Sequence, residues 1–281
     1  MPLAVWPVAQ TSPQYQRTGR YLPDCTAHPG KMLPALAARI ITDYTKPGQL
    51  IVDPMCGIGT TLVEAAARDR RAIGVDLEDR WASLALANCE HVLTPEQCLG
   101  IDVRVGDAQA LPSVLHDAIG QVDLVLVSPP YGCDAGTIDK PTWRSGGRLC
   151  PAASLNYSTD RANVGHARGE AYAAAMTAIY TGCHTLLRPG GLLVTVTKNT
   201  RRKGRTFDLA GTTVALARAA GFTYLQHVIA LHAAIRDSQL AARPSFWQLT
   251  QTRRARGRGE PVQLGVHEDV LVFRAEPGVR R

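Results

Sequence analysis

The sequence predicts an α/β protein with a mixed, mostly parallel sheet and helices on both faces. Three observations lead to this fold class. Short apolar runs typical of buried strands alternate with segments of helical spacing, the first four runs end in an acidic or hydroxyl residue, and turn residues separate the segments. With 281 residues, 45% of them hydrophobic, the chain is long enough for one large domain.

The first half of the chain alternates regularly once an N-terminal arm has passed. Residues 1–30 are rich in Pro, Gln and Thr without a clear period, which predicts an extended arm or loop. Strands are expected at 50–54, 71–76, 101–107 and 122–128. Helices are expected at 31–45, 60–69 and 80–93, with a short helix before the fourth strand.

The second half repeats the pattern around two interruptions. Helices are expected at 172–187 and 208–221, strands at 192–199, 222–233 and 268–275, and a turn at "RPGG". The seven expected strands form one sheet. Residues 133–168 and 234–265 read as irregular insertions, and segments of this length are often functional. The simplest division is a single domain over residues 1–281 with these insertions as candidate target-recognition segments.

The composition limits the classes of partner and cofactor. A net charge of +7 and a pI near 9.2 favour a polyanion such as nucleic acid, the alternative being a general richness in arginine. No apolar run has the length of a membrane span and no secretory leader is evident, so we expect a cytoplasmic protein without a membrane partner. The seven cysteines form no C-x-x-C pair, so neither a disulfide framework nor a metal site is expected.

Four polar residues are expected to meet in one site. Asp53, Asp76, Asp107 and Ser128 each fall at or just past the end of a predicted strand. Parallel strands end at the same edge of a sheet, and that edge is where ligands bind in this architecture. We therefore predict a single site at the carboxyl edge.

The stretch "DPMCGIGTT" (53–61) follows a strand and opens a helix, as glycine loops that approach a ligand do. Leu62 stands where a dinucleotide loop has its third glycine, and no Gly-Lys-Ser/Thr of a phosphate loop occurs. Asp53 before the loop would repel phosphates but suits a cationic ligand, and Asp76 can bind ribose hydroxyls. S-adenosylmethionine, which carries an ammonium and a sulfonium, meets these demands.

The stretch "SPPY" (128–131) ends the fourth strand, and together with "DPMCGIGTT" it resembles the DNA amino-methyltransferases, which methylate N4 of cytosine or N6 of adenine. "HPGKM" (28–32) resembles the motif that precedes the cofactor loop in this family. The resemblance implies a Rossmann-like class I methyltransferase fold and S-adenosylmethionine as cofactor. The implied cofactor residues are His28, Lys31, Asp53, Met55, Cys56, Gly57, Gly59, Thr60, Thr61, Asp76, Leu77, Asp107, Ala108 and Ser128.

The chemistry of amine transfer explains the residues of "SPPY". The lone pair of an exocyclic base amine is conjugated with the ring, so acceptors for its two hydrogens must localise it. The Ser128 hydroxyl and the carbonyl of Pro129 are the candidate acceptors, and Pro129 and Pro130 stiffen the backbone. Tyr131 offers a face on which an extruded base can stack. These four residues are the predicted catalytic set.

The resemblance leaves the acceptor open. A serine before the two prolines is seen mostly in cytosine-N4 enzymes of the family, so site-specific methylation of cytosine N4 in DNA is the first expectation. The alternatives are adenine N6 in DNA, an amine of RNA or of a small nucleoside, and a catalytically idle nucleic-acid-binding module. A restriction endonuclease is a candidate partner. Candidate nucleic-acid contacts are Trp143, Arg144, Arg148, Arg201, Arg202, Arg253 and Arg254.

Overall fold

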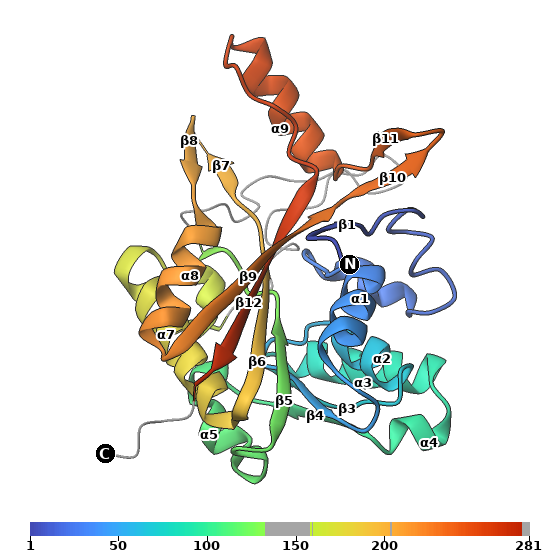
Figure 1. The fold of residues 1–281 in the computed structure, drawn as a ribbon, viewed down its shortest axis with the longest axis vertical. Helices are drawn as coiled ribbons and strands as arrows, with labels where there is room; N and C mark the ends of the chain where they lie inside the picture. The colour runs from blue at the N-terminus through green and yellow to red at the C-terminus, as the bar shows by residue number, and fades with distance from the viewer. Residues whose placement is uncertain (133–157, 159, 203, 277–281) are drawn as a thin grey trace.

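The computed structural model describes residues 1–132, 158, 160–202 and 204–276. Within them one mixed sheet forms the centre of the molecule (Figure 1). Its strands are β1 (Val5–Pro7), β2 (Leu50–Asp53), β3 (Arg71–Asp76), β4 (Ile101–Val105), β5 (Val122–Val127), β6 (Leu187–Thr197), β9 (Phe222–Leu231) and β12 (His267–Ala275). Their order in the described part of the chain is β1-β9-β12-β6-β5-β2-β3-β4.

The strand directions confirm the predicted fold class. β2 to β6 run parallel to one another, and β12 is antiparallel to both of its neighbours, β6 and β9. The described sheet has eight strands rather than the expected seven because the arm adds β1 to its edge, where Val5 pairs with Ile229. Three residues that include a proline carry too little pattern to predict a strand.

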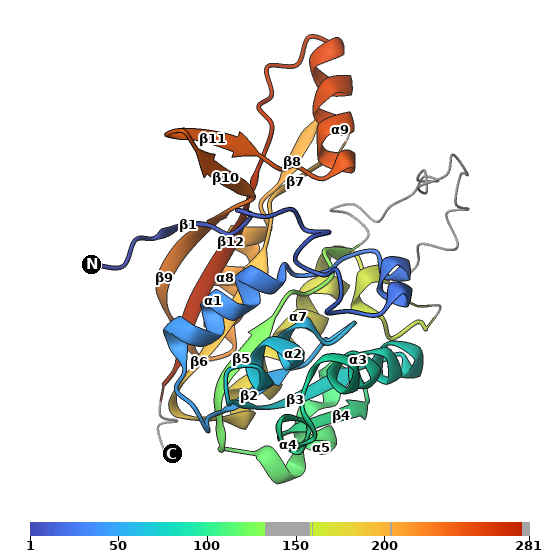
Figure 2. The same ribbon diagram turned by 90° about the vertical axis from the view of Figure 1, so that its right-hand side faces the viewer.

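Helices cover both faces of the sheet. One face carries α1 (Pro34–Tyr44), α2 (Thr60–Ala66) and α3 (Asp79–Val92), and the other carries α5 (Leu111–Val114), α7 (Gly169–Leu186) and α8 (Leu209–Ala219), as Figures 1 and 2 show. The remaining helical turns are α4 (Pro95–Cys98) and the 3-10 turns η1 (Pro23–Ala27), η2 (Ala108–Ala110), η3 (His116–Ala118) and η5 (Val164–His166). Among the described residues no helix is both long and apolar enough to cross a lipid bilayer.

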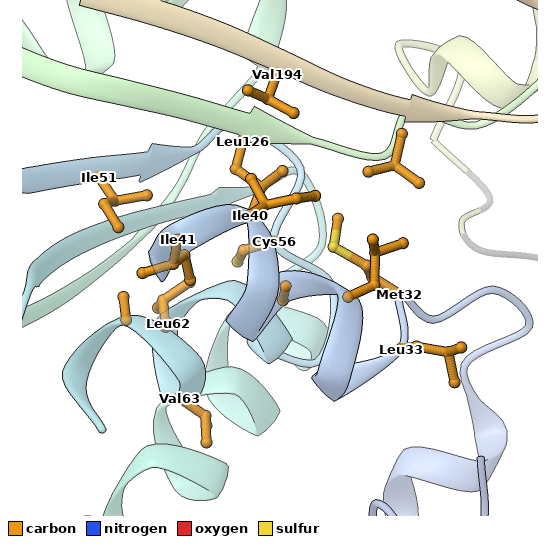
Figure 3. Packing of buried hydrophobic residues seen from close by; sticks show 14 of the residues in the cluster. Met32, Leu33, Ile40, Ile41, Ile51, Cys56, Leu62, Val63, Leu126 and Val194 are labelled. Carbon is orange, nitrogen blue, oxygen red and sulfur yellow. The ribbon is translucent and has the colours of Figure 1, made fainter. Parts of the chain in front are cut away.

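Alternating strand residues build a hydrophobic core on each face. Ile51 and Leu126 pack beneath α1 and α2, whereas Val52 and Val127 pack on the side of α7. Figure 3 shows the first of these cores, where Ile41 of α1 lies next to Leu62 of α2 and Ile40 lies next to Leu126 of β5. Strands buried on both faces read as continuous apolar runs, which is why the sequence predicted them well.

Three structures project beyond the carboxyl edge of the sheet (Figures 1 and 2). They are the hairpin of β7 (Thr200–Arg202) and β8 (Arg205–Phe207), the hairpin of β10 (Ala233–Arg236) and β11 (Gln239–Ala242), and α9 (Phe246–Gly257). The interpretation of 234–265 as irregular is therefore wrong over residues 234–257, which hold β10, β11 and α9. Asp237 and Ser238 adopt positive φ in a two-residue turn, and Ser245 and Gln248 form a capping box at α9. "RPGG" likewise lies within β6 instead of forming a separate turn.

The assignment of the whole chain to one domain stays a prediction, and most of residues 133–168 lies outside the described residues.

Candidate active site

A pocket lies at the carboxyl edge of the sheet, where the sequence placed the site. All but one of the predicted cofactor and catalytic residues line it. They are His28, Lys31, Asp53, Met55, Cys56, Gly57, Thr60, Thr61, Asp76, Leu77, Asp107, Ala108, Ser128, Pro129, Pro130 and Tyr131. Residues from five separate stretches of the chain thus converge, four of them because parallel strands end at the same edge.

The glycine loop is held against β3 by its backbone. Gly57 has φ of 53°, and its N–H donates to the Asp76 carboxylate at 2.9 Å. A Cβ at Gly57 would lie 3.0 Å from Nε2 of His28, so only glycine leaves the present space between loop and histidine.

Gly59 is the predicted residue that does not line the pocket. It has φ of 78°, precedes the first residue of α2, and packs on α3, where an added Cβ would lie 2.9 Å from the Cβ of Ala85. The second glycine of the loop therefore sets the packing of two helices. The position of Gly59 in the motif predicted contact with the cofactor. The sequence alone could not distinguish that role from the packing of two helices.

Asp53 is buried at the end of β2. Its carboxylate accepts hydrogen bonds from the Thr61 hydroxyl at 2.5 Å and from the Met55 N–H at 3.1 Å. Burial nevertheless raises the pKa of Asp53 to about 7, and the charge of Asp76 adds to the shift. A cationic ligand in the pocket would favour the ionised form.

Two further acids end the next strands. Asp76 accepts from the N–H groups of Gly57 and Glu78, and burial raises the pKa of its carboxyl. Asp107 accepts from the Gln109 N–H at 2.9 Å and so caps η2. Backbone donors therefore fix the orientation of both carboxylates while each keeps lone pairs for a ligand.

His28 and Lys31 form one wall of the pocket. The His28 ring meets the Trp81 ring edge-on, with centroids 4.6 Å apart, and burial lowers the pKa of His28 to about 4. The Lys31 ammonium donates to the His28 carbonyl at 2.6 Å, and burial lowers the pKa of Lys31 to about 8. His28 is therefore neutral at neutral pH.

"SPPY" follows β5 without a break. The Pro130 carbonyl accepts a hydrogen bond from the Tyr172 hydroxyl of α7 at 3.1 Å. Within the described residues, neither the Ser128 hydroxyl nor the Pro129 carbonyl has a hydrogen-bond partner, and both residues line the pocket. Tyr172 thus holds the Pro130 carbonyl in place, and the Pro129 carbonyl stays available for a ligand.

The residues predicted to contact nucleic acid form two groups. Trp143, Arg144 and Arg148 lie outside the described residues. The others lie on the projections and not in the pocket: Arg201 and Arg202 on β7, Arg253 and Arg254 on α9. Arg253 and Arg254 are exposed, whereas the Arg201 guanidinium pairs with Glu260 at 2.8 Å.

The structure adds lining residues that sequence reasoning missed. They include Glu78, Trp81, Asn163 and Glu268. Glu78 follows Asp76 by two residues and could have been found from that spacing. Trp81 lies on α3 and Glu268 on β12, and neither belongs to a motif used above, so only the fold shows that they line the pocket.

Comparison with known proteins agrees with the two motifs. The model of the family N6_N4_Mtase, described as DNA methylase, matches residues 2–87. The tRNA (guanine(10)-N2)-dimethyltransferase of Methanocaldococcus jannaschii is 36% identical over 118 residues, which are 40% of this chain and 33% of that protein. A type II methyltransferase of Streptococcus pneumoniae is 41% identical over 63 residues, 22% of this chain and 24% of that protein. The chain spans about a third of the length of the first of these relatives.

Solved structures of low identity share the fold. TrmN from Thermus thermophilus superposes with a TM-score of 0.52 at 19% identity, covering 91% of this chain and 52% of that one. A geranyl diphosphate methyltransferase superposes with a TM-score of 0.51 at 14% identity, covering 86% of this chain and 79% of that one.

The fold is shared with the superposed structures, and S-adenosylmethionine is a cofactor that the pocket suits. The residues present fit this cofactor, because a cationic ligand suits buried Asp53 and Asp76, and the space that a Cβ at Gly57 would fill is left open beside His28. The match of residues 2–87 to the N6_N4_Mtase family and the similarity to the type II relative support the resemblance to the N6/N4 amino-methyltransferases.

Proposed function

We propose that this methyltransferase acts on an exocyclic amine of a nucleic-acid base. The observation that carries the proposal is the placement of "SPPY" in the same pocket as the glycine loop and the acids of β2 and β3. The lone pair of an exocyclic base amine is conjugated with the ring. A hydroxyl and a rigid carbonyl beside the methyl donor can accept the two amino hydrogens and direct the lone pair toward the methyl group.

Each residue of the set has a separate task. The Ser128 hydroxyl and the Pro129 carbonyl accept the two amino hydrogens and so turn the amine lone pair out of conjugation. Tyr131 stacks on the ring of the extruded base. Asp76 holds the ribose of the cofactor, Asp107 its adenine amine, and Asp53 its cationic end. S-adenosylmethionine supplies the methyl group when bound.

Cytosine N4 in DNA is the first candidate acceptor. Ser128 favours it through the resemblance to cytosine-N4 enzymes, and the family description and the type II relative support DNA as the polymer. A restriction partner, a cytoplasmic location and adenine N6 as target stay predictions.

Guanine N2 in RNA is the second candidate. The observation that favours it is the similarity to the archaeal tRNA (guanine(10)-N2)-dimethyltransferase, which matches a longer stretch of this chain than the type II relative does. The match covers only 40% of this chain, so sequence identity alone does not assign the same acceptor base to this protein.

The projections at the carboxyl edge support a polymer rather than a free nucleoside. Arg253 and Arg254 of α9 are exposed, and the β7–β8 hairpin brings Arg201 to the same end of the molecule as the pocket (Figure 2). Cations outside the pocket can bind the phosphates that flank an extruded base.

One assay tests the function and divides the candidates. The protein is incubated with methyl-labelled S-adenosylmethionine and with DNA, RNA or free nucleosides, and the labelled base is identified after digestion. Label in DNA cytosine supports the first candidate, and label in RNA guanine the second. A protein that binds the cofactor but labels no nucleic acid and no nucleoside would contradict the proposal.

A further inference from the structure

Glu268 stands apart from the other residues of the pocket. Among the described residues that line it, Glu268 alone comes from the chain beyond Val164. Neither the cofactor loop nor "SPPY" gives it a task, and it lies at the start of the last strand of the sheet.

The topology places Glu268 on the acceptor side of the pocket. Asp53, Asp76 and Asp107 follow β2, β3 and β4, which lie on one side of β5 in the sheet. β12 lies on the other side of β5, beyond β6, and Asp269 pairs with Thr197 at the edge where β6 ends. "SPPY" therefore stands between the cofactor acids and Glu268.

The surroundings of Glu268 leave its carboxylate incompletely bonded. Its side chain is 19% exposed, and its Oε2 lies 3.0 Å from Nε2 of His232, whose side chain is 15% exposed. This contact buries Oε2 against the histidine, whereas within the described residues no hydrogen bond is formed to Oε1. Burial lowers the pKa of Arg17 and of Lys198, and the negative charge of Glu268 opposes that shift in both. A carboxylate oxygen that lies in the wall of a pocket and is not bonded to a protein donor can accept a hydrogen bond from a ligand.

We propose that Glu268 reads the ring nitrogen beside the target amine and selects a base that carries a hydrogen there. This specificity rests on the proposed amine transfer and names its acceptor more closely. An ionised carboxylate only accepts hydrogen bonds. Guanine carries N1–H next to its N2 amine, whereas cytosine N3 and adenine N1 present lone pairs next to theirs.

The energetic consequence is discrimination between bases. With guanine, Glu268 accepts from N1–H while Ser128 and Pro129 accept from the amine. With cytosine or adenine, the carboxylate of Glu268 faces the lone pair of the ring nitrogen. Neither the carboxylate nor the nitrogen then forms a hydrogen bond, and a site built to bind an N–H strongly rejects such a base. Glu268 thus favours guanine N2 over cytosine N4, the reverse of the preference that Ser128 alone suggests.

The test compares guanine with 2-aminopurine, which keeps the 2-amine but has a lone pair at N1. Single-stranded DNA and RNA oligonucleotides carrying one guanine, 2-aminopurine, cytosine or adenine are offered to the wild-type protein, to Glu268→Gln and to Glu96→Gln, an exposed control on α4. Methyl transfer and the dissociation constant of S-adenosylmethionine are measured for each. The wild type and Glu96→Gln prefer guanine over 2-aminopurine by about 100-fold or more, and Glu268→Gln reduces this ratio to less than about tenfold without changing cofactor binding.

The remaining outcomes overturn the inference in distinguishable ways. Wild-type transfer to cytosine or adenine in place of guanine refutes the role of Glu268 and leaves the proposed function standing. An unchanged guanine preference in Glu268→Gln, with weaker cofactor binding, makes Glu268 a cofactor ligand instead. Transfer to none of the oligonucleotides, with cofactor bound, refutes the proposed amine transfer and this inference together.

Discussion

The two halves of the sheet hold the same pocket in different ways. On the side of β2, β3 and β4, each acid is oriented by backbone N–H groups close to it in sequence, such as Met55 for Asp53 and Gln109 for Asp107. On the side of β9 and β12, the acid that lines the pocket meets a side chain distant in sequence, because Glu268 contacts His232 at 3.0 Å.

Under the proposed function, this difference separates a cofactor half (the side of β2, β3 and β4) from an acceptor half (the side of β9 and β12). In the cofactor half, each carboxylate is bonded to a backbone N–H only a few residues away. A short sequence motif therefore contains all the residues that orient it. Contacts of the acceptor half exist only once β9 and β12 have paired, and the Arg-rich projections extend from the same edge. Changes in the first half should affect cofactor binding, and changes in the second should affect the choice and binding of the acceptor.

The largest expected effect is at the boundary between the halves. Ser128→Ala removes one acceptor for the amine and should lower the transfer rate by about 100-fold or more, while the dissociation constant of S-adenosylmethionine changes far less. Single-turnover transfer and equilibrium binding measure the two quantities. Ser113→Ala, an exposed serine on α5, serves as the control. Turnover at the wild-type rate would remove Ser128 from the catalytic set.

The next effect should be confined to the cofactor half. Asp76→Ala removes the carboxylate that holds the glycine loop and binds the ribose, so the dissociation constant of S-adenosylmethionine should rise by about ten- to 100-fold. The preference among acceptor bases should not change. Calorimetric titration of the variant and of Asp102→Ala, whose carboxylate pairs with Arg104 outside the pocket, provides the measurement. An altered base preference would break the division into halves.

The pKa of Asp53 gives the cofactor half a pH dependence. The pKa of this carboxyl has an ordinary value of 3.8 and is raised to about 7 in the fold by burial, so the folded state holds the proton more tightly than the unfolded state. The resulting stabilisation is complete below the unfolded value and is lost as the pH rises through about 7. Relative to Asp53→Asn, the free energy of unfolding of the wild type should fall by on the order of 1 kcal/mol per pH unit across this window.

Denaturant titrations at several pH values between these limits measure that difference, and Asp24→Asn at an exposed position is the control. A difference between the wild type and Asp53→Asn that is independent of pH would contradict the assigned burial effect.

The smallest effect is expected on α9. Replacing Arg253 and Arg254 by glutamine should weaken binding of an oligonucleotide several-fold and lower the salt dependence of binding by about two charges, because phosphate contacts release counterions. Cofactor affinity should not change. Fluorescence anisotropy at several salt concentrations tests this, with Arg218→Gln of α8 as a single-charge control away from the edge. Unchanged binding would move the polymer contact to another part of the acceptor half.

The same contrast explains what the sequence could predict. Every predicted strand of the main sheet is present, and all predicted cofactor residues except Gly59 line the pocket. β2, β3 and β5 are buried on both faces, so their apolar runs were unambiguous, and the acids follow them directly.

Sequence reasoning failed where the defining contact is long-range. β1 exists because Val5–Pro7 pairs with β9, more than two hundred residues away, and its own residues show no alternation. Glu268 enters the pocket because β12 is inserted between β6 and β9, a pairing that no local pattern reveals. The β10–β11 turn uses Asp237 and Ser238 at positive φ without a glycine, so the usual turn signal was missing.

The central claim is that "SPPY" and the cofactor acids form one centre for transfer to a base amine. Its most direct test is mass spectrometry of the base methylated by the wild-type protein, with Ser128→Ala in parallel. We predict that the methyl group is on an exocyclic nitrogen and that the product falls by about 100-fold or more in the variant. A methyl group on a ring atom, or undiminished product from the variant, would contradict the account.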